Sequence, residues 1–243
     1  MTTTLRPDGP QTPTPGGGRT RSYRIRVNGR DAGGLVLASD GPRPATGRIV
    51  RLTVDEADRR RGRGTVAALA AEEILRDWGC ADAGAVVPAD ATTALRLAAS
   101  LGWTERARTF GKPLPGQEQP GRERPAQEPS GPFVRVLREE DTGETLGTVR
   151  MSPTGGPPDG AGAHVHSLTV AEAHRGRGHV RALLLLAEET ARAAGRPGIG
   201  VTLPLPAPYG APEPGVPDPT RADRLLRALG YRPTAHHVYK SLR

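Results

Sequence analysis

Alternating hydrophobic and polar residues predict a β-hairpin near the start of the chain. The segments YRIRV at 23–27 and GLVLA at 34–38 alternate on either side of Asn28-Gly29, a pair typical of tight hairpin turns. A third strand is predicted at 48–54, where the chain ends a hydrophobic run in Leu-Thr-Val. Together these segments indicate a small sheet rather than a helical bundle.

The hydrophobic period then changes from two to about 3.6 residues, which predicts a helix that ends near Gly79. An apolar stripe is expected on this helix, formed by Val66, Leu69, Ala70, Ile74 and Trp78. A short strand at 85–87 and a second helix follow. The second helix ends in Leu-Gly-Trp at 101–103, and a last strand is expected at 108–112.

The same order of elements recurs in the second half of the chain. Residues 52–73 and 168–189 share 12 identities in 22 positions at an offset of 116. Hydrophobic segments at 133–137 and 145–150 repeat the hairpin, and 236–242 repeats the last strand. The sequence therefore predicts a mixed α/β (α+β) protein of two tandem domains, each a mostly antiparallel sheet with two main helices.

Composition sets the expected boundaries of these domains. Gly (32) and Pro (25) are abundant in the 243 residues, and they concentrate at the start and middle of the chain. We therefore expect a disordered N-terminal tail and a Pro/Gly linker. The expected division is 1–21 for the tail, 22–112 for domain 1, 113–131 for the linker and 132–243 for domain 2, each domain being closed by its own last strand.

Charge and cysteine content narrow the functional classes. The net charge is +8, almost all of it from arginine, since Lys112 and Lys240 are the two lysines. This bias fits either a GC-rich coding sequence or a polyanionic or phosphate-rich ligand. There is no apolar run long enough to span a membrane and no secretory signal, and the single Cys80 cannot form an internal disulfide. A cytoplasmic protein without membrane contact is expected.

An Arg/Gly-rich loop between a strand and a helix occurs in both copies. Such a loop can bind phosphate, because glycines expose backbone N–H groups and the following helix adds the positive end of its dipole. Neither loop has the lysine of the GxxxxGK[ST] phosphate loop. The dinucleotide pattern GxGxxG/A is met only nominally, by Gly62, Gly64 and Ala67, too far from the strand end.

The two loops resemble the GNAT N-acetyltransferase superfamily, whose motif is a strand ending in L-x-V, a loop of Q/R-x-x-G-x-G/A, and a helix. The first copy matches fully, and the second departs only at Val180. The resemblance implies that the loop amides bind the pyrophosphate of acetyl-CoA and that the splayed strand end pairs with the pantetheine arm. The implied cofactor residues are Leu52, Thr53, Val54, Arg59, Arg60, Arg61, Gly62, Arg63 and Gly64, with Leu168, Thr169, Val170, Arg175, Gly176, Arg177, Gly178, His179 and Val180.

The same resemblance implies where a general base would lie, six residues before the valine of L-x-V. That position is His164 in the second copy and Arg48 in the first. Histidine titrates near neutral pH and arginine does not, so the second copy is the expected catalyst, although His164 could equally be a strand histidine without a role. Strand alternation is expected to place His164, His166 and Leu168 on one face.

The resemblance also implies a tyrosine that protonates the leaving thiolate. The family's leaving-group tyrosine is absent, since Ala98 and Leu226 stand at its positions. Tyr209, in a proline-rich insertion, is the expected substitute, whereas Tyr231 is expected to be a core residue. No histidine set has the spacing of a zinc motif, so no metal is expected.

The expected function is an acetyl-CoA-dependent N-acetyltransferase that acts on an amine acceptor, either a small amine or a protein lysine or N-terminus. The chain would be a monomer with an internal pseudo-dimer or a homodimer. The alternative is a non-catalytic acyl-CoA-binding or scaffolding protein. Nucleic acid is a weak candidate partner, because no basic face interleaved with aromatics appears.

Overall fold

The computed structural model describes residues 2–14, 16–41, 45–115, 133–156, 160–205 and 218–243. The chain forms two compact units. The first unit comprises Met1–Arg106 together with Ala235–Arg243, and the second comprises Ala107–Thr234. None of the helices in the described ranges is long and apolar enough to cross a membrane.

The first unit is a mostly antiparallel sheet with two helices. Its strands run in the order β1-β3-β4-β5-β6-β12, and the parallel pair in this order is β5 with β6. The helices are α1 (Arg63–Asp77) and α2 (Thr92–Ser100). The strands are β1 (Thr3–Pro7), β2 (Thr12–Pro13), β3 (Arg19–Val27), β4 (Arg30–Asp40), β5 (Ala45–Val54), β6 (Cys80–Pro88) and the part of β12 (Arg232–Ser241) from Ala235 onward.

The second unit repeats this architecture. Its strands run in the order β7-β11-β10-β9-β8, and β10 with β11 is the parallel pair. The helices are α3 (His179–Ala193) and α4 (Pro219–Ala228). The strands are β8 (Phe133–Arg138), β9 (Thr145–Gly156), β10 (Gly162–Val170), β11 (Gly198–Pro204) and the part of β7 (Thr104–Pro113) from Ala107 onward. The predicted fold class and tandem repeat are confirmed.

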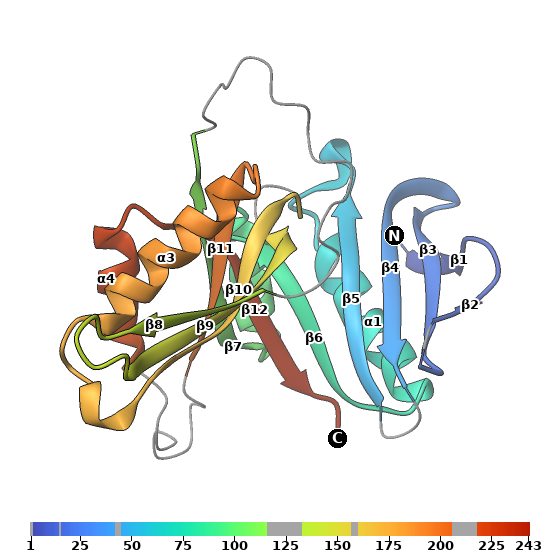
Figure 1. Ribbon diagram of the computed structural model, residues 1–243. Coiled ribbons are helices and arrows are strands. Elements are labelled where there is room, and N and C mark those ends of the chain that lie inside the picture. The colour runs from blue at the N-terminus through green and yellow to red at the C-terminus, as the bar shows by residue number, and fades with distance from the viewer. Residues whose placement is uncertain (1, 15, 42–44, 116–132, 157–159, 206–217) are drawn as a thin grey trace, which may run out of the picture. The chain divides into compact units, whose positions relative to one another are not determined.

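The two copies exchange their last strands, which the sequence did not predict. β12, from the end of the second copy, pairs antiparallel with β6 of the first, Val238 opposite Ala85 (Figure 1). β7, from the end of the first copy, pairs with β11 of the second, Phe110 opposite Val201. The expectation that each copy is closed by its own last strand is therefore wrong, because pairing in a sheet does not require sequence proximity.

The beginning of the chain also differs from the expected disordered tail. Residues Thr3–Pro7 form β1, which pairs antiparallel with β3, Leu5 opposite Ile25. Their backbone groups complete the edge of the sheet, and this offsets the weak hydrophobicity of the segment. Most of the expected linker 113–131 lies outside the described residues; Leu114 is buried against the second unit's core.

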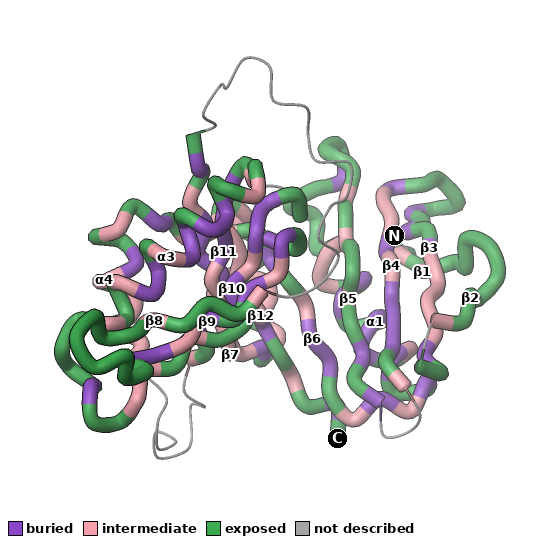
Figure 2. The backbone as a smooth tube through the Cα atoms, viewed as in Figure 1, coloured by how far each residue is buried: buried purple, intermediate pink, exposed green. Residues whose placement is uncertain are grey.

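The hairpin turn follows the sequence closely. Asn28 and Gly29 have φ values of 49° and 82°, the left-handed geometry that Asn-Gly favours, and they join β3 to β4. Much of β4 is buried, including Leu35 and the consecutive residues Leu37, Ala38 and Ser39 (Figure 2). Leu35 and Leu37 pack against α1 to form the core of the first unit.

The apolar stripe predicted on α1 is only partly buried, since Trp78 belongs to the core of the first unit and Ile74 packs against it, but the stripe's first residues do not. Val66 and Leu69 are 42% and 44% exposed. The buried positions are instead mostly alanines, together with Leu75 and the carboxylate of Glu72. Small side chains let the helix approach the sheet closely, so the face of greatest hydrophobicity is not the face that packs.

Candidate functional site

Each repeated loop leads from the third strand of its copy into a long helix through a short 3-10 turn. In the first copy Arg60 and Gly62 have φ values of 58° and 74°. In the second copy the equivalent Gly176 and Gly178 have values of 80° and 87°. The backbone conformation is thus repeated although arginine replaces glycine at one position. It is a conformation that turns successive N–H groups toward one side, as in anion-binding loops.

The first turn of each helix is open to a ligand. Gly62 and Gly178 are the N-cap residues of α1 and α3, and neither has a side chain that could cap the helix. The first N–H groups of the helix therefore have no capping side chain, and they carry the positive end of the helix dipole. A Cβ built on Gly62 would meet nothing within 4 Å, so the space in front of the turn is empty of protein atoms.

The structure divides the loop arginines of the first copy into two groups. Arg59 donates from Nε to the carbonyl oxygen of Val54 at 2.9 Å, and the largely buried Arg63 donates from Nη1 to Thr3 Oγ1 at 2.9 Å. These two arginines hold the loop. Arg60 and Arg61 are exposed and make no side-chain hydrogen bond or ion pair with the described residues. They are the charges available to an anion.

In each copy, a polar contact between one buried and one exposed side chain links the loop to the hairpin. In the first copy Asp58, 1% exposed, accepts from Arg30 at 2.8 Å. In the second copy the equivalent residue is His174, whose Nε2 lies 3.0 Å from Glu144. Both contacts connect the 3-10 turn to the segment that follows the hairpin turn. They therefore hold the loop in position relative to the sheet.

A cleft opens where β5 and β6 separate. Their parallel pairing extends from Ala45 to Ile49 of β5 and stops there. Beyond this point lies a cavity of about 350 Å³ with largely apolar walls from β5, β6, α1, α2 and β12. Its lining includes Val87, Leu97, Trp103 and Val238. The predicted splaying of the Leu-Thr-Val strand is confirmed. Gly64, at the start of α1, lies next to Leu97 of the cleft lining, since an added Cβ would be 3.4 Å from it.

A β-bulge marks the same position in each copy. Val50 is the extra residue between the pairs Leu37–Ile49 and Val36–Arg51, and His166 is the extra residue between Val165 and Ser167. A bulge reverses the alternation of the residues that follow it. Leu168 therefore packs toward the core with Val165, and the prediction that it shares a face with His164 is wrong.

The structure places the catalytic candidates of the second copy in different environments. His164 lies on β10, partly buried, with Nε2 3.5 Å from Thr202 Oγ1 and its ring 5.2 Å from that of His166. Tyr209 lies outside the described residues. Tyr231 is fully buried, as predicted, and burial raises the pKa of its hydroxyl well above the usual range, with Glu188 adding to the effect. Among the described residues no group of three metal-binding side chains occurs.

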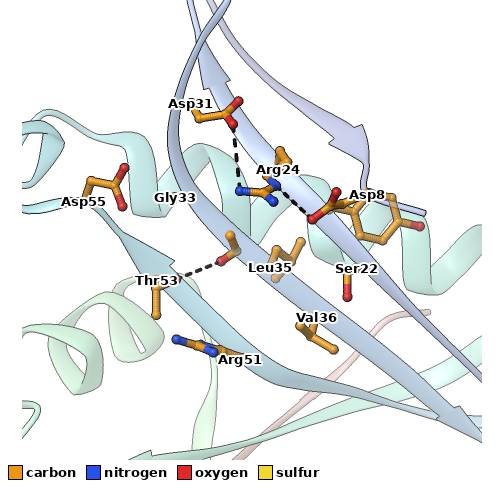
Figure 3. Close-up of a pocket in the computed structure, with 12 residues that line it drawn as sticks. Asp8, Ser22, Arg24, Asp31, Gly33, Leu35, Val36, Arg51, Thr53 and Asp55 are labelled. Atoms are coloured by element: carbon orange, nitrogen blue, oxygen red, sulfur yellow. Dashed lines mark hydrogen bonds and ion pairs between the residues drawn. The ribbon is translucent and has the colours of Figure 1, made fainter.

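A second, polar hollow lies on the face of the first sheet that α1 does not cover (Figure 3). It has a volume of about 320 Å³ and is lined by residues of β3, β4 and β5. Arg24 bridges Asp8 at 2.8 Å and Asp31 at 3.8 Å, whereas Arg51 and Asp55 form no ion pair within the described residues. Arg51 also lines the apolar cleft, so this residue borders both cavities.

Comparison with known proteins places these features in a family. The model of the acetyltransferase (GNAT) family matches residues 13–103 and again 105–202. The chain therefore belongs to the GNAT acetyltransferase family and carries two copies of its domain. No curated protein matches the chain.

Solved structures agree with the fold. A GCN5-related N-acetyltransferase from Sphaerobacter thermophilus has a TM-score of 0.56 at 18% identity, over 91% of this chain and 81% of its own. A tandem GNAT protein from the clavulanic acid biosynthesis pathway has a TM-score of 0.50 at 19% identity, over 96% of this chain and 85% of its own. At these identities the likeness concerns the fold alone.

Proposed function

We propose that this chain transfers an acetyl group from acetyl-CoA to the nitrogen of an amine. The observation that carries the proposal is the first copy's anion-binding loop standing at the end of an apolar cleft between separated strands. The loop suits a pyrophosphate and the cleft suits the pantetheine arm, so one extended molecule with both parts fits the pair. Membership of the acetyltransferase family supports acyl transfer as the reaction.

In the first copy the proposed pyrophosphate ligands are the backbone N–H groups of the α1 turn and the side chains of Arg60 and Arg61. The pantetheine amides would pair with the unpaired edge of β5 from Val50 to Val54, since this edge lacks a strand partner beyond Ile49. Arg59 and Arg63 would act by holding the loop, because their side chains are already engaged.

In the second copy the corresponding loop is proposed to bind the same cofactor, with His164 as its candidate base. Arg175 lies 4.0 Å from Glu172, a long and exposed contact, and Arg177 forms no ion pair within the described part of the chain. The departure from the motif is Val180, whose side chain stands in the first turn of α3 and is 39% exposed. We expect weaker cofactor binding here than at Gly64 in the first copy.

The acceptor is proposed to approach over the polar hollow. In this region the sheet is not covered by α1, and Arg51 borders both the hollow and the cleft. Asp55 is exposed and unpaired within the described residues, so it suits an ammonium group before deprotonation. Cys80 is buried and forms no disulfide within the described residues, which suits a reducing cytoplasm.

Release of free thiol from acetyl-CoA, measured against a panel of small amines, lysine peptides and N-terminal peptides, tests the proposal. The expected result is release that saturates with at least one amine. The alternative is a non-catalytic acyl-CoA-binding protein, and it predicts cofactor binding by calorimetry without amine-dependent release. Absence of both binding and release would reject both functions.

A further inference from the structure

In the first copy, the position equivalent to the second copy's candidate base does not hold a base. At the position equivalent to His164 stands Arg48, which pairs with Asp40 at 2.7 Å and cannot accept a proton at neutral pH. The neighbouring bulge residue is Val50, and Val86 lies across the opening on β6. None of these side chains can move a proton. A neighbouring strand can supply such a group.

The strand next to β6 in the first unit is β12, the last strand of the chain. Its register places His237 opposite Val86 and Tyr239 opposite Gly84. Side chains that are directly opposite in an antiparallel pair lie on one face, with Cβ atoms about 5 Å apart. His237 is therefore the neighbour of Val86, the first residue of β6 beyond its parallel pairing with β5.

Alternation along β12 fixes the face on which His237 lies. Lys240 donates to Glu72 on α1, and Val238 and Leu242 are in the core, so these residues face the helices. His237 and Tyr239 must face the other way. The ring of Tyr239 lies against Gly84, where an added Cβ would come within 3.0 Å of it, and this contact confirms the assignment.

The surroundings of His237 keep its imidazole neutral at physiological pH. Burial lowers the pKa of His237, and the neighbouring His236 lowers it further, whereas Glu105 on β7 opposes the shift. Glu105 is itself engaged by His236, at 2.6 Å. Other polar groups on this face include the phenol of Tyr239 and, across Gly84, the guanidinium of Arg48 with its partner Asp40.

We propose that His237, carried into the first unit by the exchanged strand, is the general base for acetyl transfer at the first copy's cleft. This inference rests on the proposed function. The amine nitrogen bonds to the thioester carbonyl carbon and gives its proton to the imidazole of His237. The carbon–sulfur bond then breaks, CoA leaves as the thiolate and takes a proton from water, and His237 returns its proton to solvent.

The second unit shows the complementary arrangement. There the residue that occupies the register position of His237 is Thr109 of β7, opposite Thr202. Its hydroxyl lies 3.0 Å from that of Thr202, which in turn lies 3.5 Å from His164. Each unit thus holds a histidine beside the point where its parallel strands separate. In the second unit it is His164 on β10, and in the first unit it is His237 on the exchanged strand β12.

The variant His237→Gln tests the proposal, with His236→Gln as the matched control, because His236 is adjacent but faces the helices. Both are made in a Gly178→Glu background, in which the second copy's loop should no longer bind the cofactor, and the expected result for His237→Gln is a fall in kcat of about 100-fold or more with unchanged acetyl-CoA affinity by calorimetry. The acid limb of kcat/KM, expected below pH 6.5, should disappear, and added imidazole should restore part of the rate in His237→Ala. Turnover of His237→Gln equal to that of the Gly178→Glu background would overturn the proposal.

A second readout separates this inference from the proposed function. The ring signals of His237, assigned by their loss in His237→Gln, are followed by NMR as acetyl-CoA is added. They should shift in wild type and stay in place in Gly62→Glu. If no amine is acetylated, the proposed function fails. The ring signals would still report whether His237 lies beside the bound acetyl-CoA. Signals that do not move at saturating acetyl-CoA would overturn the inference.

Discussion

The ammonium group of Lys240 lies 2.7 Å from a carboxylate oxygen of Glu72, 168 residues earlier in the chain. Glu72 is 1% exposed, and its other oxygen accepts from Trp103 Nε1 at 2.9 Å. In the second unit Lys112 contacts both oxygens of Glu188 at 2.8 Å. The two lysines of the chain thus hold the two exchanged strands against the helices of the other copies.

Replacing Lys240 with Met should destabilise the first unit strongly. The buried Glu72 carboxylate would lose its main cation, and breaking such a pair typically costs about 3–5 kcal/mol. Urea unfolding monitored by the fluorescence of Trp78 and Trp103 measures the change. The double variant Glu72→Gln with Lys240→Met should be closer to wild type than Lys240→Met alone. Simple additivity of the two single changes would contradict a direct coupling.

The two loops can be tested separately by introducing a negative charge into each. Gly62→Glu places a carboxylate in front of the open turn of α1, and Gly178→Glu does the same at α3. Each should remove one acetyl-CoA site in calorimetry, through repulsion of phosphate. Since both glycines have positive φ, the controls are Gly62→Ala and Gly178→Ala, which add the backbone strain without the charge. A binding stoichiometry that stays at the wild-type value in both glutamate variants would show that the loops are not the site.

Substitution of the first copy's loop arginines should distinguish those that bind the cofactor from those that stabilise the fold. Arg60→Ala and Arg61→Ala should each weaken acetyl-CoA binding by about 5- to 10-fold, as expected for loss of one charge-assisted contact, with little change in melting temperature. Arg63→Ala should instead lower the melting temperature, since Arg63 is buried and donates to Thr3. Thermal shift with and without cofactor distinguishes these effects. A stability loss in Arg60→Ala would place that side chain in the fold instead.

The pH dependence of stability offers an independent check on His237. Because burial lowers its pKa in the folded protein, the unfolded chain binds a proton at a higher pH than the folded chain does. The free energy of unfolding should therefore decrease as pH falls below about 6.5, the ordinary histidine value. Urea unfolding at pH 7 and pH 5 should show a smaller decrease in His237→Gln than in wild type. An unchanged difference would mean that His237 titrates normally.

Local patterns were enough to predict much of the architecture. The repeat at an offset of 116, the Asn28-Gly29 turn and the loop–helix junctions at Gly62 and Gly178 all depend on residues close in sequence, and the structure reproduces them. The backbone conformation of the loop could also be predicted, because glycine conformation and the helix dipole are local properties.

Long-range pairing was decided only by the tertiary structure. No periodicity distinguishes a last strand that returns to its own copy from one that joins the other, since both bury the same alternate residues. The two lysines were a visible signal, but their partners Glu72 and Glu188 appear in sequence as ordinary helical glutamates. The bulges at Val50 and His166 and the placement of His237 beside Val86 likewise depend on register, which is set by packing across strands far apart in the chain.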